Sequence, residues 1–337
     1  MRLLRTFFQK VLNWGGGATP HNSYPTQLPK KGGLILGLNV NNLTKSFGEK
    51  VAVDDISFHI DAPGVFGLIG TNGAGKTTTI RMILGIMRPD SGSSDWNKKP
   101  ISRETLAFGY MPEERGIYMK SRVLEQLIYF GMLRGMNKTD AKNSALSLMG
   151  RVGVLEYKDM FAEKLSKGNQ QKIQLIATLI HNPTLLFLDE PFSGLDPINT
   201  ETLRNLMGEL VDEKKYIVMS SHQMSVVEEY CRDIVILNRG KTVLSGNLKQ
   251  IKAGYGHTNL IIKVDDNHIS HVRQLAENTS LSLYEDRADE LEYLINGDAV
   301  AQEFLSTLVS DNIFPLKYEI KEPSLNAIFI EKVGGKV

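Results

Sequence analysis

The sequence predicts an α/β fold built on a largely parallel sheet, followed by a small α+β domain. Strand-like apolar runs at 184–188, 216–219 and 234–237 alternate with helical stretches, which is the pattern of a parallel α/β core. A glycine-rich loop at 70–77 joins a further apolar strand to a helix. After Gly254 the chain changes to short strands and helices that follow one another closely. The length of 337 residues agrees with about two domains.

Charge and composition narrow the classes of function. The 39 Lys and Arg residues balance 38 Asp and Glu residues, so no strong overall field favours nucleic acid as a partner. A single cysteine, Cys231, excludes an intramolecular disulfide and is compatible with a reducing compartment. No apolar run reaches the roughly 18 residues of a membrane helix, so another chain must cross the membrane if the protein works there.

The N-terminal segment is predicted to stand apart from the folded core. Residues 1–14 place apolar side chains at helical spacing beside Arg2, Arg5 and Lys10, which predicts a basic amphipathic helix. Such a helix suits a bilayer surface or a partner's groove, but packing on its own protein or an upstream start codon would also explain it. The Gly-, Pro- and Asn-rich residues 15–33 are predicted to form a flexible linker.

The core domain is predicted to begin with strands. Alternating residues over 34–60 predict two strands with a turn at 47–50, and 63–69 predict the strand before the glycine-rich loop. Residues 121–180 have a mostly helical pattern, with Thr139 as the expected N-cap of one helix.

The C-terminal part is predicted to fold as a unit of its own. Its strands and helices are expected at 258–264, 268–278, 281–286, 291–295, 299–310 and 315–321, with a short helix at the end. The order is βαββαβ, the ferredoxin-like arrangement. The predicted domains are therefore 34–254 and 255–337.

The glycine-rich loop predicts a phosphate-binding site. It reads Gly70-Thr71-Asn72-Gly73-Ala74-Gly75-Lys76-Thr77, fits G-x-x-x-x-G-K-[ST], and continues into Thr78. Its glycines let successive backbone N–H groups turn toward an anion, and the next helix directs its N-terminal dipole at the same anion. Lys76 would contact the β- and γ-phosphates, and Thr77 would offer its hydroxyl to Mg²⁺. The loop therefore predicts nucleotide binding.

A pair of carboxylates follows the apolar strand at 185–188. Asp189 and Glu190 stand at its C-terminal end, where doubly wound sheets place ligand chemistry. Asp189 is expected to hold Mg²⁺ through its water shell, and Glu190 to orient or deprotonate an attacking water. The competing interpretation is an exposed pair that forms ordinary surface contacts.

Further motifs decide between the families of phosphate-loop proteins. GTPases need Asn-Lys-x-Asp, and neither Asn-Lys pair of this chain has the Asp in place. Residues 165–172, Leu-Ser-Lys-Gly-Asn-Gln-Gln-Lys, resemble the signature of the ATP-binding-cassette (ABC) ATPases. Ser193-Gly194-Leu195-Asp196 resembles the D-loop of that family, and His222 its switch histidine. Phe47 resembles the aromatic residue that stacks on adenine.

The resemblance implies a P-loop ABC ATPase domain with a RecA-like core, a β subdomain and a helical subdomain at about 112–180. It implies that ATP lies between the phosphate loop of one copy and the signature of another, whose Ser166 and Gly168 complete the site. A second ATP-binding subunit is then required, and a homodimer is expected. His222 would contact the γ-phosphate, and Phe47 would stack on the base of the nucleotide. Because stacking tolerates different bases, GTP could replace ATP.

Three positions depart from the pattern of the family. The signature has Lys167 in place of its first glycine and Asn169 in place of its glutamine. Glu113 aligns with a glutamine that senses Mg²⁺ and the membrane partner in most relatives. Its carboxylate could reach the metal or orient water, or it could simply pair with Arg115.

These departures resemble one subgroup of the family. The residues that carry this resemblance are Tyr110-Met111-Pro112-Glu113-Glu114-Arg115-Gly116, the signature, and Glu322-Pro323-Ser324-Leu325 near the C-terminus. They are similar to ATPase subunits of bacterial type-2 ABC exporters, in the group that exports sodium, drugs or bacteriocins. The resemblance implies coupling of ATP hydrolysis to export by a separate polytopic permease, with this chain at the cytoplasmic face of the cell membrane.

Two other functions stay open. Soluble ABC ATPases with a regulatory role have no permease, although such relatives usually carry two cassettes or a long insertion. The C-terminal domain could be a ligand sensor, whereas dimerisation or stability is the simpler role for it.

Overall fold

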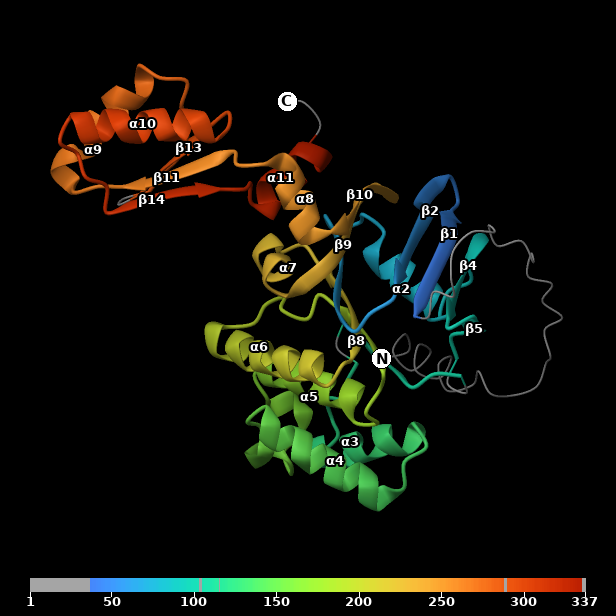
Figure 1. Cartoon of the computed structure of the whole chain (residues 1–337). Helices are drawn as coiled ribbons and strands as arrows, with labels where there is room; N and C mark the ends of the chain where they lie inside the picture. Colours follow the sequence, from blue (N-terminus) through green and yellow to red (C-terminus); the bar gives the residue numbers. More distant parts are fainter. Residues whose placement is uncertain (1–36, 103–104, 115, 288–289, 335–337) are drawn as a thin grey trace. The chain divides into compact units, whose positions relative to one another are not determined.

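The computed structural model describes residues 37–102, 105–114, 116–287 and 290–334 (Figure 1). The expected helix at 1–14 and the linker at 15–33 lie outside these residues. The described chain divides between Val243 and Leu244 into two compact units. The sequence predicted this boundary later in the chain, after residue 254. The structure places it earlier, because helix α8, Leu248–Tyr255, groups with the second unit.

Two sheets form the first unit, apart from the end of strand β10, Lys241–Asn247, which extends past Val243. The antiparallel sheet has the order β2-β1-β4-β5, from Lys50–Ile60, Leu38–Phe47, Ser91–Trp96 and Lys99–Pro100. The six-stranded sheet has the order β10-β9-β3-β8-β7-β6, from Lys241–Asn247, Cys231–Asn238, Gly64–Gly70, Tyr216–Ser221, Leu185–Asp189 and Phe108–Met111. In the larger sheet β3 runs parallel to β8 and β9, and β7 runs parallel to β6 and β8. The predicted parallel core is confirmed.

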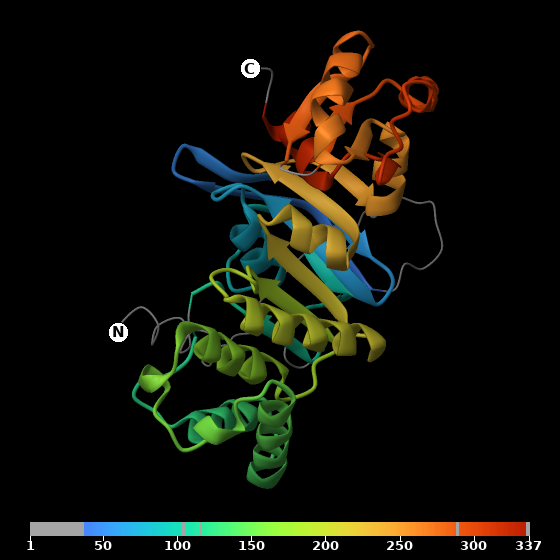
Figure 2. The ribbon, with the colours of Figure 1, turned by 90° about the vertical axis from the view of Figure 1, so that its left-hand side faces the viewer.

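The helices of the first unit connect these strands. They are α2 (Lys76–Ile83), α3 (Val123–Leu133), α4 (Lys138–Arg151), α5 (Lys167–Leu179), α6 (Pro197–Asp212) and α7 (Met224–Tyr230), with single 3₁₀ turns at Leu155–Tyr157 and Ala162–Lys164. The green helices α3 and α4 gather at one end of this unit in both views (Figure 2). They contact α5, which leads back to the sheet through β7.

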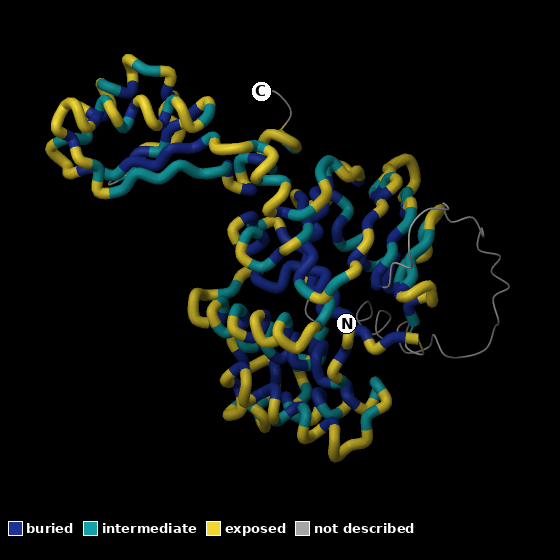
Figure 3. The backbone as a smooth tube through the Cα atoms, in the orientation of Figure 1, coloured by how far each residue is buried: buried dark blue, intermediate teal, exposed yellow. Residues whose placement is uncertain are grey.

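A shared apolar core joins the two sheets. Ile80 of α2 is completely buried and Ile83 almost completely. They belong to one apolar cluster with residues of both sheets, among them Leu43 and Phe187. The dark tube along the central strands in Figure 3 follows this core. Strand β7 is buried at every position, which explains why its sequence is continuously apolar rather than alternating.

Helix α4 begins at a different residue from the one expected. Asn137, not Thr139, is the N-cap, and its side-chain oxygen accepts the backbone N–H of Asp140 at 2.8 Å. The Asn137 amide also donates to the Asp140 carboxylate at 2.6 Å. This reciprocal pair satisfies a free N–H of the first turn, which Thr139 inside the helix does not do.

The second unit has its own sheet and core. Its antiparallel sheet has the order β12-β13-β11-β14, from Ser282–Asp286, Leu291–Leu294, Asn259–Lys263 and Lys317–Lys321. Helices α9 (Asp266–Glu277) and α10 (Asp298–Ser310) pack on one face through residues such as Val272 and Phe304, and α11 (Leu325–Val333) follows. The first strand lies between the third and the fourth, so the ferredoxin-like prediction is confirmed.

Candidate active site

The phosphate loop occupies the carboxyl end of β3 and leads into α2. Gly75 adopts a φ of +108°, and a Cβ there would lie 2.7 Å from the Ala52 carbonyl oxygen on β2. Only glycine fits this position without displacing backbone. The outer residues Thr71, Asn72 and Gly73 are exposed, so the rim of the loop is open to a ligand.

Lys76 is the buried cation of the loop. Its side chain is 7% exposed, and Nζ donates to the Gly70 carbonyl at 2.7 Å and lies 3.1 Å from Glu190 Oε1. A longer contact of 3.4 Å reaches the Thr71 carbonyl. The positive charge therefore stands inside the loop, directly beside the carboxylate that follows β7.

Asp189 is completely buried at the end of β7. Thr77 Oγ1 donates to its Oδ2 at 2.8 Å, and the Ser220 hydroxyl donates to its Oδ1. Burial raises the pKa of Asp189, while the hydrogen bonds from Ser220 and Thr77 act in the opposite direction. Two of the oxygens expected at a Mg²⁺ site thus already lie together.

Glu190 has an unusual backbone for a carboxylate residue. Its φ is +54°, in the left-handed region, and its N–H donates to Ser220 Oγ at 3.0 Å. The side chain is 5% exposed, with Oε2 lying 2.9 Å from His222 Nδ1. The turn therefore directs this carboxylate back toward both Lys76 and His222.

The donor set fits Mg²⁺. The hydroxyl of Thr77 and the carboxylate of Asp189 are hard oxygen ligands, which this ion prefers. Among the described residues, no group of three or more His, Cys, Asp or Glu side chains could hold a metal.

The signature forms the beginning of α5. Ser166 is the exposed N-cap and accepts the Asn169 N–H at 3.3 Å, as expected for a helix that begins near Ser166. Gly168 packs on α6, where an added Cβ would lie 2.3 Å from Asn199 Nδ2. Asn199 in turn donates to Asp196, the N-cap of α6, through its backbone and its amide. Close packing thus joins the signature to the segment that resembles the D-loop.

Sequence reasoning missed three side chains beside these motifs. Ser220 bonds Asp189 and the Glu190 backbone, and Gln171 and Gln174 on α5 donate to carbonyls of Pro191 and Pro112. The available signals were the Ser-Ser pair before His222 and the i, i+3 spacing of the two glutamines.

The predicted site residues fall into two groups. Hydrogen bonds and ion pairs bring together the phosphate loop, Asp189, Glu190 and His222. Ser166 and Gly168 lie instead at the start of α5, and their contacts are with α5 and α6.

Phe47 ends β1 with 49% of its surface exposed, and Lys45 Nζ lies 5.9 Å from its ring centre. Glu113 is exposed just after β6, while Arg115, its suggested partner, lies outside the described residues.

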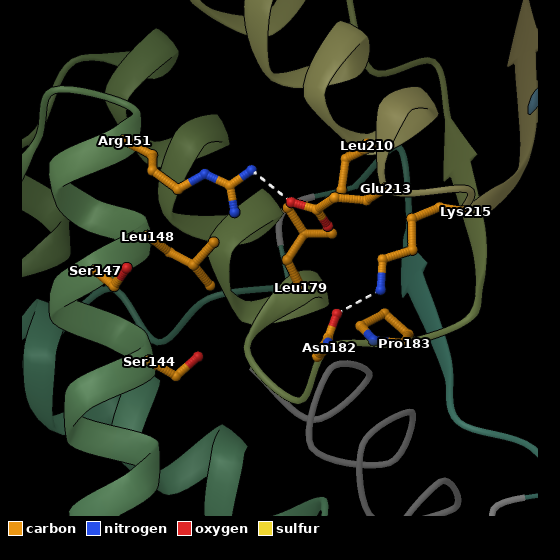
Figure 4. A pocket seen from close by; sticks show the side chains of 10 residues that line it. All are labelled: Ser144, Ser147, Leu148, Arg151, Leu179, Asn182, Pro183, Leu210, Glu213 and Lys215. Carbon is orange, nitrogen blue, oxygen red and sulfur yellow. Dashed lines mark hydrogen bonds and ion pairs between the residues drawn. The ribbon is translucent and has the colours of Figure 1, made fainter.

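A separate cavity of about 480 Å³ lies between α4, α5 and α6 (Figure 4). Arg151 of α4 crosses it and pairs with Glu209 at 2.5 Å and Glu213 at 3.1 Å on and just after α6. On another side Lys215 donates to Asn182. The ion pairs of Arg151 thus tie α4 to α6, and Lys215 is held by a neutral amide.

Comparisons with known proteins agree with these features. Residues 53–193 match the family model described as ABC transporter, and residues 246–333 match the one described as ATP-binding protein DrrA1-3-like, C-terminal domain. The chain is 42% identical over 298 residues to YhaQ of Bacillus subtilis (strain 168), described as an uncharacterized ABC transporter ATP-binding protein, covering 88% of this chain and 98% of YhaQ. It is 30% identical over 315 residues to the bacitracin transport ATP-binding protein BcrA of Bacillus licheniformis, covering 88% of this chain and 97% of BcrA.

A solved structure described as the ATP binding subunit of an ABC transporter aligns with a TM-score of 0.60 and 30% identity. The alignment covers 65% of this chain and 93% of that one. None of the described helices is both long and apolar enough to cross a membrane. The family resemblance predicted from the motifs is confirmed: the chain belongs to the ATP-binding subunits of ABC transporters, which are ATPases.

Proposed function

We propose that this chain powers an ABC exporter. MgATP binding closes a dimer of two cassettes, closure drives a separate membrane permease, and hydrolysis resets the dimer. The observation that carries the proposal is the buried cluster at the ends of β3 and β7, where Glu190 lies 3.1 Å from Lys76 and 2.9 Å from His222. The likeness to BcrA, whose description names bacitracin transport, supports the transport role.

Each residue of the cluster has a role that follows from its position. Lys76 would exchange its contact with Glu190 for the β- and γ-phosphates. Thr77 and Asp189 would hold Mg²⁺, which would neutralise phosphate charge. Glu190, once released, accepts a proton from the attacking water or orients it. His222 is 43% exposed, so it can reach the γ-phosphate from the solvent side.

The signature acts on the nucleotide of a second copy. Ser166 and Lys167 are exposed at the start of α5, so the free backbone N–H groups of that helix end are open to an incoming phosphate. Because Gly168 has no side chain, this end of the helix packs closely against Asn199 of α6. A complete site therefore takes the phosphate loop of one protomer and Ser166 and Gly168 of its partner. Exposed Phe47 stacks on the base.

The dimer is tested with the Glu190→Gln chain. A carboxamide keeps the size of the side chain but cannot take a proton, so turnover falls about 100-fold or more while ATP binding persists. Light scattering with MgATP then reports a stable dimer of the variant, and adding Ser166→Arg at the signature returns it to a monomer. Turnover of the Glu190→Gln chain close to that of the wild type contradicts the role of Glu190.

The permease is tested in native membranes. Tagged Glu190→Gln chain is incubated with detergent-solubilised membranes and MgATP, and the proteins that purify with it are identified by mass spectrometry. A polytopic protein in stoichiometric amount, lost without ATP, supports a peripheral subunit at the cytoplasmic face. Ribosomal or DNA-associated proteins in its place support the soluble regulatory alternative.

A further inference from the structure

A buried amide on α5 holds the segment that carries Glu113. Gln174 is 5% exposed, and its Nε2 donates to the Pro112 carbonyl at 2.6 Å and to the Glu114 carbonyl at 3.2 Å. An amide nitrogen has two N–H groups, so a single side chain satisfies both carbonyls. The two bonds fix the backbone on either side of Glu113.

The segment lies at the edge of the sheet that carries the acidic pair. Strand β6 is parallel to β7 with Met111 opposite Leu188, so Glu113 follows the end of β6 much as Glu190 follows Asp189, the last residue of β7. Carboxyl ends of neighbouring parallel strands meet at one edge. Glu113 therefore lies at the edge of the sheet where the nucleotide's metal is proposed to bind.

Helix α5 joins this segment to the rest of the site. One turn before Gln174, the Gln171 amide donates to the carbonyl of Pro191, which follows Glu190 directly. The two glutamines lie at i and i+3, on one face of the helix. The helix that begins at the signature thus contacts both acidic segments of the sheet edge.

We propose that Gln174 is a positioning residue for Glu113: it sets where the Glu113 carboxylate stands, and through it the affinity of the site for the nucleotide's divalent cation. This inference rests on the proposed function, because it takes Asp189 and Thr77 to hold that cation. The simpler role for Gln174 is to satisfy two buried carbonyls with no effect on the metal.

The experiment measures metal binding rather than turnover. Mn²⁺ replaces Mg²⁺, and its affinity in the presence of ATP is followed by electron paramagnetic resonance in the full-length Glu190→Gln chain. Gln174→Met keeps the length of the side chain but removes both donors. We expect about tenfold weaker Mn²⁺ binding, the usual size of an effect transmitted through a ligand's neighbour.

Gln126→Met is the matched control. Gln126 on α3 is 3% exposed, and its Nε2 also donates to two backbone carbonyls, of Tyr118 at 3.3 Å and of Ser121 at 3.4 Å. Its Oε1 also accepts the Tyr118 N–H at 3.0 Å, so this variant loses three hydrogen bonds, all to residues 118–121 and none to the backbone on either side of Glu113. Its Mn²⁺ affinity should therefore stay within about twofold of the parent. If Gln174→Met does not fold, Gln174→Asn retains an amide too short to reach the carbonyls and takes its place.

A double-mutant cycle with Glu113→Gln separates positioning from a structural role. If Gln174 acts through Glu113, adding Gln174→Met to Glu113→Gln weakens Mn²⁺ binding by less than about twofold. An equal loss with and without the Glu113 carboxylate, or no loss in Gln174→Met alone, overturns the inference. If the parent chain itself binds no Mn²⁺ with ATP, the proposed function fails together with the inference. If the parent binds Mn²⁺ but the variants behave in either of the ways just described, only the inference about Gln174 fails.

Discussion

Glu190 and Lys76 form an ion pair of 3.1 Å in which both side chains are at least 90% buried. The cation that should hold the phosphates is thus occupied by the carboxylate proposed to activate water. In a buried site these charges interact strongly, so each is stabilised by the other until a nucleotide replaces the carboxylate. We therefore propose that ATP binding and the release of Glu190 are one event.

This pairing predicts how Glu190→Gln changes affinity. The carboxamide removes the charge that competes with the γ-phosphate for Lys76, so a non-hydrolysable ATP analogue should bind about fivefold more tightly than to the wild type, or about 1 kcal/mol. Fluorescence titration measures the two dissociation constants. His222→Gln removes the other partner of Glu190 but leaves the Lys76 contact in place, so it should not tighten binding; because His222 is itself proposed to contact the γ-phosphate, it should weaken binding instead. Weaker binding by Glu190→Gln speaks against competition.

The contact between Gly168 and Asn199 predicts a pair of coupled substitutions. In Gly168→Ala the new Cβ would meet Asn199 Nδ2 at 2.3 Å, so the chain should lose about 2 kcal/mol of unfolding free energy and most of its ATPase activity. Adding Asn199→Ala removes the obstructing amide and should restore most of the stability. Urea denaturation of the single and double variants measures this coupling, and strictly additive losses would contradict it.

The N-cap of α4 predicts unequal effects of two nearby substitutions. Asn137→Ala removes the acceptor for the Asp140 N–H and should lower the unfolding free energy by about 1 kcal/mol. Thr139→Ala, inside the same turn, should change it by less than about 0.5 kcal/mol. Thermal denaturation compares them, with ATPase activity unchanged in both. A larger loss in Thr139→Ala would assign the cap to the other residue.

Asp196 predicts a dependence of stability on pH. The Asn199 backbone N–H, donating at 2.9 Å, and then the Asn199 amide hold the pKa of Asp196 below its usual value of 3.8. A lowered pKa in the folded state stabilises it above pH 3.8, and this contribution is lost as the pH falls through the folded pKa. Asp196→Asn keeps an acceptor that does not titrate. Its urea midpoint should therefore fall less steeply than that of the wild type in this acidic range.

Much of the site could be predicted from local sequence. The loop from Gly70 to Thr77 needs glycines, one lysine and one hydroxyl at fixed spacing, because successive backbone N–H groups must surround a phosphate. Asp189 and Glu190 were found because they end a continuously apolar strand. The βαββαβ unit was predicted from the order of its elements, because short runs of alternating apolar and polar residues indicate strands.

The remaining relationships depend on pairing between distant segments. Strand β8 lies between β3 and β7, and its pairing with β7 brings Ser220 to Asp189 and His222 to Glu190. No local pattern specifies that order, because strands of similar composition can pair in several ways. The contact between Gln174 and Pro112 could not be predicted for the same reason. Helical periodicity places Gln174 on one face of α5, but it does not say which segment packs against that face.

The sequence by itself therefore determined the family, the fold class and the residue types that are proposed to bind phosphate and metal, because each of these rests on chemistry within a few consecutive residues. Only the tertiary structure decided that Lys76 is held by Glu190 and that Gln174 holds the segment of Glu113. Both contacts form between side chains far apart in the chain, and their geometry is set by how the sheet and α5 pack together.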